Sequence, residues 1–146
     1  MIGWSSHAGI SKGARRATAA VEFAVLAPFL FTLAMGAFEV GRAVMGRQVL
    51  TDAARKACRT GILPGKANAD ITSDVNDILT DNGIPTADAT VTILVNGAAV
   101  DASTANAGDQ ISVKVSVPAH DITWTAQIFI SNANIDSETL VMMRQG

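Results

Sequence analysis

The side chain whose surroundings point most clearly to chemistry is the carboxylate of Glu22. Its neighbours are apolar on both sides, and no charged residue occurs in the sixteen positions from Phe23 to Phe38. An ionised carboxylate near the start of a membrane-spanning helix costs on the order of a few kcal/mol, so such residues are usually paired and functional. We therefore expect Glu22 to pair with a cation. The alternative is that it only marks the edge of a membrane.

Reactive side chains are sparse in the rest of the sequence. His120 and Asp121 form a neighbouring histidine–carboxylate pair, but no serine or cysteine lies in a recognisable nucleophile turn. Cys58 borders an apolar stripe, which favours a buried, unreactive thiol. Two histidines and one cysteine are too few for a zinc site with four Cys or His ligands. We therefore expect no enzyme, no metal site and no cofactor.

Four aspartates recur at spacings of four, three and four residues: Asp70, Asp74, Asp77 and Asp81. On a helix this spacing places them on one face. Such a face could hold a hard cation, but calcium sites take closely spaced oxygen atoms from irregular loops. We therefore interpret it as a solvated polar face, and a bound cation remains the open alternative.

Composition narrows the class of protein. The 146 residues are enough for one modest folded unit, because domains usually have about 100–200 residues. Hydrophobic residues make up 49% of the chain and charged residues 16%, below the roughly 25% usual for soluble domains. The net charge of −2 provides no positive field that would attract nucleic acid. A single cysteine forbids any disulfide within the chain.

Hydropathy predicts the element that positions Glu22. The uncharged run, extended back to Ala17, would span about 33 Å as a helix, enough for the roughly 30 Å hydrocarbon core of a membrane. Small and apolar residues then recur at helical spacing to about Thr60, which predicts that the helix continues as an amphipathic stem. We expect a basic, unstructured leader over 1–17, this helix over 18–60 and a small α+β domain over 61–146.

The C-terminal part is predicted to contain a short helix and an antiparallel sheet. Apolar residues at helical spacing predict the helix over 69–81, starting near Asn68 or Asp70 and stopping at Asn82-Gly83. Asn96-Gly97 predicts a tight turn between strands. Alternating apolar residues predict the strands themselves, over 89–95, 98–101, 110–117 and 134–143, and residues 122–130 are ambiguous between strand and helix.

Five stretches of the sequence, taken in order, match the pattern of one known family. The most specific is Arg15–Pro28, with the sequence RRATAAVEFAVLAP. The others are Phe38–Arg42, Gln48–Arg55, Gly108–Val115 and the closing strand that ends at Met143-Arg144. In this order they resemble the TadE-like proteins, the minor pseudopilins of the tight-adherence (Flp-type) pilus assembly system. The resemblance implies a pilin-like fold and a membrane-anchored subunit that helps to assemble such a pilus or a related secretion apparatus.

The resemblance also implies how the N-terminus is processed and what Glu22 does. A prepilin peptidase would cut on the cytoplasmic side between Ala17 and Thr18, so that Glu22 becomes the fifth residue of the mature chain. The family usually has glycine before the cut, and Ala17 departs from that pattern. Glu22 would attract the free amine of a neighbouring subunit. The implied partners are the membrane, the peptidase, other pilus-assembly subunits and further copies of this chain that associate through the N-terminal helix.

The expected location is the inner (cytoplasmic) membrane, crossed once, with the N-terminus in the cytoplasm and the C-terminal domain outside. Lysine and arginine are more numerous just after the span than before it, which by itself favours the reverse orientation, but domains longer than about 60 residues cross largely regardless of charge. The alternative function is a secreted or membrane-tethered binding domain, with Ala34-Met35-Gly36 as the cleavage signal of an ordinary signal peptide.

Overall fold

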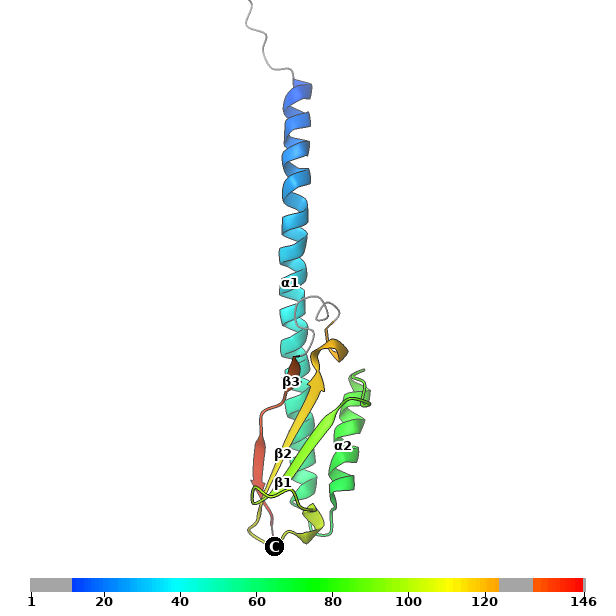
Figure 1. Ribbon diagram of the computed structural model, residues 1–146, viewed down its shortest axis with the longest axis vertical. Helices are drawn as coiled ribbons and strands as arrows, with labels where there is room; N and C mark the ends of the chain where they lie inside the picture. Colours follow the sequence, from blue (N-terminus) through cyan, green and yellow to red (C-terminus); the bar gives the residue numbers. More distant parts are fainter. Residues whose placement is uncertain (1–11, 124–132, 146) are drawn as a thin grey trace, which may run out of the picture. The chain divides into compact units, whose positions relative to one another are not determined.

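The fold joins one very long helix to a small sheet with a second helix beside it. The computed structural model describes residues 12–123 and 133–145. The predicted α+β class is confirmed: a long apolar helix is followed by a short helix and an antiparallel sheet (Figure 1). The elements in chain order are α1 (Lys12–Gly61), α2 (Asn68–Asp81), β1 (Thr90–Val95), η1 (Ala102–Thr104), β2 (Gln110–Pro118), η2 (Ala119–Asp121), β3 (Asn134–Asp136) and β4 (Leu140–Met143).

Helix α1 is 50 residues long and continues without interruption through Pro28. It begins at Lys12, so residues 12–17 are helical although the sequence predicts that they belong to an unstructured leader. The alanines and arginines of residues 14–17 have high helix propensities, which outweigh the single glycine at position 13. Residues 1–11 of the predicted leader lie outside the described residues.

Helix α1 contributes to both compact units into which the chain divides, Met1–Phe38 and Glu39–Gly146. Every described residue of the first unit is helical. In the second unit, the remainder of α1 packs with α2 and the sheet, and Leu50 is the first of its large side chains to be fully buried. The predicted amphipathic stem is therefore a component of the second unit's core.

The hydrophobic core of the second unit lies on one face of the sheet. Four side chains of β2 have no exposed area and alternate with polar neighbours, as the sequence period predicts: Ile111, Val113, Val115 and Val117. The two helices cover this face (Figure 1). Helix α1 contributes mainly small residues, which let its backbone approach the sheet closely, whereas α2 contributes Ile71, Val75 and Leu79.

Strands β1 and β2 pair antiparallel along the whole of β1, from Thr90 opposite Ser116 to Val95 opposite Ile111. The tight turn is where the sequence predicts it, with Asn96 at φ 51° and Gly97 at φ 81°. Both angles are positive, as the two central residues of a type I′ turn require. The predicted return strand over 98–101 is wrong, because the structure has only an isolated bridge between Val95 and Ala98 before the chain enters η1.

The strand predicted over 134–143 is divided into β3 and β4, which both pair with β2. The interruption is at Ser137, a buried residue between the two strands. Its hydroxyl oxygen accepts a hydrogen bond from the backbone N–H of Val115 at 2.9 Å, and its own N–H donates to the Val115 carbonyl at 2.8 Å. The Ser137 hydroxyl thus takes the place of a backbone carbonyl in the hydrogen bonding between strands. The alternating pattern of apolar residues gives no sign of this interruption.

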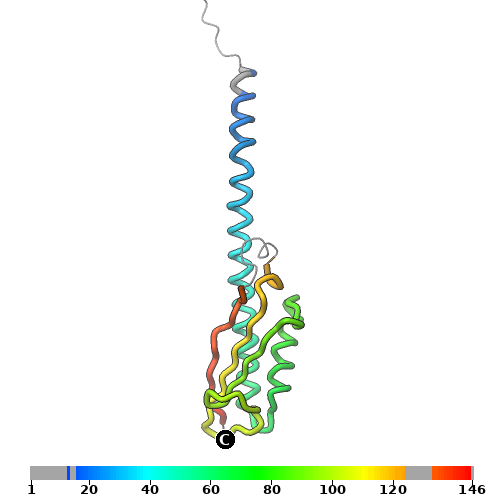
Figure 2. Tube along the Cα trace, in the orientation of Figure 1, coloured from blue at the N-terminus to red at the C-terminus, as the bar shows by residue number. Residues whose placement is uncertain are grey.

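Helix α2 begins at Asn68 and ends before Asn82-Gly83, as predicted to within one residue. Gly83 has φ +70°, the left-handed conformation that commonly terminates helices. Of the ambiguous segment 122–130, residues 124–130 lie outside the described residues. The C-terminal end lies beside the loop between β1 and β2 (Figure 2), where the Arg144 guanidinium donates a hydrogen bond to the Ala102 carbonyl.

Candidate functional site

The most unusual surface in the described chain belongs to the first unit, whose large apolar side chains are exposed. Ten of them have exposed fractions between 47% and 73%: Val21, Phe23, Val25, Leu26, Phe29, Leu30, Phe31, Leu33, Met35 and Phe38. A helix that is apolar on all sides is usually buried in a large core or in a membrane. Contiguous exposed apolar area of this kind typically marks contact with another protein or with lipid.

The helix that carries this surface is long and apolar enough to cross a membrane. The candidate span lies within Arg16–Gly61, where the most apolar window has a mean hydropathy of 1.9 and no buried residue. Pro28 removes one backbone donor within it, and the hydroxyl of Thr32 donates a hydrogen bond to the Pro28 carbonyl at 2.9 Å. The carbonyl that Pro28 leaves without its helical donor is the one four residues earlier, at Ala24, and membrane helices tolerate such a proline.

The three residues implicated by the family resemblance all lie on α1 and are exposed. Ala17, Thr18 and Glu22 occupy its second and third turns. Thr18 and Glu22 are four residues apart, so they lie on the same face of the helix, separated by about 6 Å along its axis. Glu22 is the only acidic residue of α1 before Glu39. The helix thus holds one carboxylate close to the proposed new N-terminus and surrounds it with apolar side chains.

Cys58 is buried, as its position beside the apolar stripe predicted. Its thiol donates a hydrogen bond to the carbonyl oxygen of Ile111 at 3.3 Å. Burial raises the pKa of this thiol above its ordinary value of 9.0. A buried thiol with a raised pKa carries little thiolate at neutral pH, so Cys58 is a poor nucleophile.

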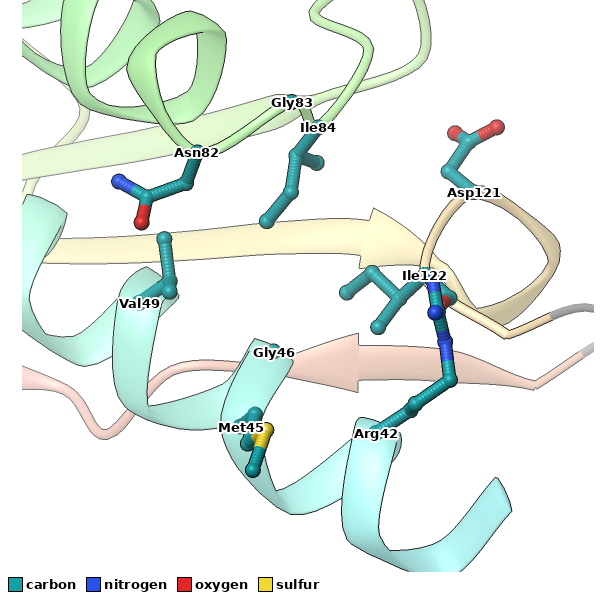
Figure 3. Close-up of a pocket in the computed structure, with 9 residues that line it drawn as sticks. All are labelled: Arg42, Met45, Gly46, Val49, Asn82, Gly83, Ile84, Asp121 and Ile122. Atoms are coloured by element: carbon teal, nitrogen blue, oxygen red, sulfur yellow. The ribbon is translucent and has the colours of Figure 1, made fainter. Parts of the chain in front are cut away.

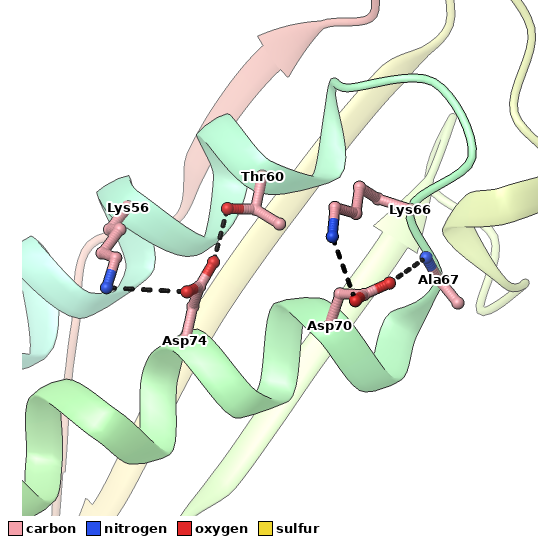
Figure 4. A network of polar contacts seen from close by, with 6 residues as sticks. All are labelled: Lys56, Thr60, Lys66, Ala67, Asp70 and Asp74. Carbon is pink, nitrogen blue, oxygen red and sulfur yellow. Dashed lines mark hydrogen bonds and ion pairs between the residues drawn. The ribbon is translucent and has the colours of Figure 1, made fainter.

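Two of the four aspartates on α2 are held by lysines from outside that helix (Figure 4). Asp70 accepts hydrogen bonds from the Ala67 backbone N–H at 3.0 Å and from Lys66 at 3.2 Å, and these contacts lower its pKa. Asp74 lies 3.5 Å from the Lys56 ammonium and accepts a hydrogen bond from the Thr60 hydroxyl. These contacts connect α2 to the end of α1 and to the intervening loop, and they give both carboxylates partners from the chain itself.

His120 and Asp121, noted as a neighbouring pair in the sequence, are in contact in η2, with His120 Nε2 3.3 Å from Asp121 Oδ1. The structure adds Asp88, which precedes β1 and is 32 positions earlier in the chain. Sequence reasoning missed Asp88 because no local motif connects it to the pair. The only available signal was the pairing of β1 with β2, which brings the start of one strand to the end of the other.

A pocket of about 300 Å³ lies between α1, the end of α2 and η2 (Figure 3). Its lining includes Arg42, Met45 and Gly46 of α1 and Ile122 just after η2. The Arg42 guanidinium Nε donates a hydrogen bond to the Ile122 carbonyl at 3.1 Å. The charged residues of the lining are Arg42 and Asp121.

The family resemblance is confirmed for the N-terminal helix. Residues 17–59 match the model of the family described as TadE-like protein. This match covers under a third of the chain and lies entirely within α1, so the resemblance at Gly108–Val115 falls outside it. No curated protein and no solved structure matches the chain. The matched residues include Ala17, Thr18 and Glu22.

Proposed function

Because residues 17–59 match the TadE-like family, we propose that this chain is a membrane-anchored, pseudopilin-like subunit that takes part in assembling a tight-adherence-type pilus or a related secretion apparatus. The observation that supports the proposal best is the exposed apolar surface of α1 over the matched residues. Removing a large apolar side chain from water contributes about 1.5 kcal/mol or more. Ten such side chains therefore strongly favour insertion into lipid over solution in water.

The proposed anchor crosses the inner membrane once, with its N-terminus in the cytoplasm. A prepilin peptidase then cuts between Ala17 and Thr18. Because this bond lies inside α1, the residues before it must unwind locally to enter a peptidase site. Alanine and arginine have high helix propensities, so this unwinding opposes their intrinsic preference by up to about 0.7 kcal/mol per residue relative to poorer helix formers.

Glu22 is proposed to attract the amine of a neighbouring subunit. After the cut the amine belongs to Thr18, and Glu22 of the same chain lies one turn away on the same face. Pairing between chains would place one subunit's amine against the next subunit's carboxylate, and both charges would then be neutralised in a low-dielectric setting. Self-association through α1 and contact with other pilus-assembly subunits follow from this arrangement.

The first test is to fractionate cells that express the chain, wash the membranes with alkaline carbonate, and sequence the N-terminus of the retained protein. We expect the protein to stay in the membrane and to start at Thr18. Recovery in the soluble fraction would contradict the anchor. An intact Met1 would leave a plain membrane anchor and contradict processing by a prepilin peptidase.

Variants at Ala17 sharpen the test of processing. Ala17→Gly restores the residue that the family usually has and should be cut at least as fast as the wild type. Ala17→Leu should accumulate as precursor, because the residue before the cut must fit a narrow pocket. A pulse–chase experiment with electrophoresis measures both rates. Equal processing of all three proteins would place any cut elsewhere.

One observation favours the alternative of a secreted binding domain. The second compact unit begins at Glu39, and a signal-peptide cut after Ala34-Met35-Gly36 would release that whole unit with Ala37 and Phe38 before it. The same N-terminal sequencing decides between the two functions. A mature protein that starts near Ala37 and appears outside the cell would replace the pseudopilin proposal with this one.

A further inference from the structure

We propose that Asp88, His120 and Asp121 form a binding site for a divalent transition-metal ion, with Zn²⁺ as the best fit. The sequence predicts no metal site, and this cluster becomes visible only when the chain is folded. The site belongs entirely to the second compact unit and does not depend on the function proposed above.

The fold brings the three residues together through the pairing of two strands. Thr90, at the start of β1, lies opposite Ser116 of β2, two residues before that strand ends. Asp88 precedes β1 by two positions, and η2 follows β2 directly. Antiparallel pairing therefore places Asp88 at the same end of the sheet as His120 and Asp121. Two short connections supply the ligands, and a rigid hairpin fixes the distance between them.

The donor atoms have a spacing that suits a small metal ion. All three lie within 4.8 Å of one another. His120 Nε2 and Asp121 Oδ1 are 3.3 Å apart. Two ligand atoms at about 2.0–2.1 Å from a tetrahedral zinc ion are separated by roughly 3.3–3.4 Å, which agrees with this pair. Asp88 is exposed, so its carboxylate is free to move the short distance needed to complete the site.

Asp121 provides a second, independent observation. Its side chain is 12% exposed, and its Oδ2 atom is fully buried with no hydrogen-bond partner among the described residues. A buried carboxylate oxygen without a donor is costly unless a nearby positive charge compensates for it. Figure 3 shows the Asp121 carboxylate directed away from the neighbouring pocket, so the side chains lining that pocket do not satisfy it. A metal ion bound to the other carboxylate oxygen would neutralise this charge.

The chemistry of the donors selects the class of ion. One imidazole nitrogen and two carboxylate oxygens are ligands that zinc accepts, with water in the fourth position. Calcium takes six to eight oxygen ligands and does not favour nitrogen, so three donors of this kind suit it poorly. Bound metal would hold the connection before β1 to the end of β2. It would act as a clamp between these two connections, in addition to the pairing of β1 with β2.

The test uses the full chain in detergent micelles, purified with a tag that has no histidine and stripped of metal with a chelator. Isothermal titration calorimetry with Zn²⁺ should show one saturable site per chain, and the same titration with Ca²⁺ should show none. His120→Gln should abolish the site, and Asp88→Asn should weaken it at least tenfold. Because Asp88 is exposed, the second variant reports on binding even if replacing a residue of η2 disturbs the fold.

Two matched controls keep the result specific. His7→Gln removes the other histidine of the chain, and Asp81→Asn removes an exposed aspartate at the end of α2. Both should bind Zn²⁺ as the wild type does. The proposal would be overturned by the absence of saturable binding, by unchanged binding in His120→Gln and Asp88→Asn, or by loss of binding in His7→Gln.

Discussion

At the scale of single residues, Glu22 combines two properties that are rarely found together. It is ionisable, and apart from Thr18 one turn earlier, its neighbours on α1 from Ala19 to Leu26 are apolar and exposed. An acid in such a position destabilises membrane insertion unless something positive pairs with it. A chain that needed only an anchor would gain from an apolar residue here, and the proposed pairing with a neighbouring subunit's amine gives the acid a role.

Replacing Glu22 should separate insertion from association. Glu22→Ala should leave membrane insertion intact because the span becomes more apolar, and the second compact unit should stay folded because Glu22 belongs to the first. Association with copies of this chain and with other pilus components should fall at least tenfold, since an unpaired amine in a low-dielectric setting costs a few kcal/mol. Glu22→Gln should be nearly as defective, because it keeps the shape but not the charge.

Cross-linking in membranes at matched expression levels measures this effect. Glu22→Asp is the matched control, since it keeps the charge on a side chain shorter by one methylene and should retain part of the association. If all three variants associate as the wild type does, Glu22 is only a membrane-edge residue.

The residues that could be recognised from the sequence are those whose signal is local. Glu22 is identified by its neighbours in the chain, and the burial of Cys58 follows from helical spacing. Asp88 could not be recognised, because its relation to His120 depends on the register of β1 against β2. Ser137 is a similar case, since its replacement of a ladder bond depends on the strand beside it.

At the scale of elements, the packing of α1 in the second unit depends on a glycine. A Cβ atom added at Gly46 would lie 2.6 Å from Cγ2 and 2.8 Å from Cδ1 of Ile122. Ile122 is buried, and its carbonyl is held by the hydrogen bond from Arg42. Its branched side chain therefore has little freedom to move away. Gly41, one turn earlier on the same helix, has nothing within 4 Å of the same position.

These two glycines give a matched pair of substitutions. Gly41→Ala should raise the free energy of unfolding of the second unit by about 0.5–1 kcal/mol, because alanine has the higher helix propensity. Gly46→Ala gains the same propensity but overpacks the contact with Ile122, which typically costs about 1–3 kcal/mol, so the net effect should be destabilising. Pulse proteolysis of the full chain in detergent at increasing urea measures both. A Gly46→Ala variant as stable as Gly41→Ala would show that the contact with Ile122 relaxes freely.

Elements with a strong period were predictable, and those determined by pairing were not. Helix α2 and strand β2 lie where the apolar spacing predicts them, to within one or two residues. The segment over 98–101 was predicted to pair because a tight turn precedes it, but its place beside β1 is taken by β2, which has the longer alternating run. The start of α1 was misplaced because charge and glycine were taken as signs of disorder, whereas arginine and alanine favour helix.

At the scale of the whole molecule, the ionisable groups of the second unit define the pH range in which it is stable. The pKa of Asp109 is lowered by hydrogen bonds from the Asn106 backbone N–H at 2.6 Å and the Asn96 side chain at 2.8 Å. The pKa of Asp136 is lowered by Lys114 and Ser116, and that of Asp101 by Ser103. These contacts close the loop between β1 and β2 and connect β3 to β2.

The free energy of unfolding should therefore be highest over an intermediate pH range and should fall at both acid and alkaline pH. A carboxylate with a lowered pKa contributes stability that is present above its ordinary value of 3.8 and is lost as the pH falls through the lower folded value. A thiol with a raised pKa contributes stability that is present below its ordinary value of 9.0 and is lost as the pH rises through the higher folded value.

Pulse proteolysis of the full chain from about pH 2 to about pH 11 should show both declines, because this range includes the ordinary pKa values of carboxyl and thiol groups. Asp109→Asn should make the acid decline shallower and leave the alkaline one unchanged, and Cys58→Ala should do the reverse. If each variant alters both declines equally, the pH dependence arises from the net charge of the chain rather than from these contacts.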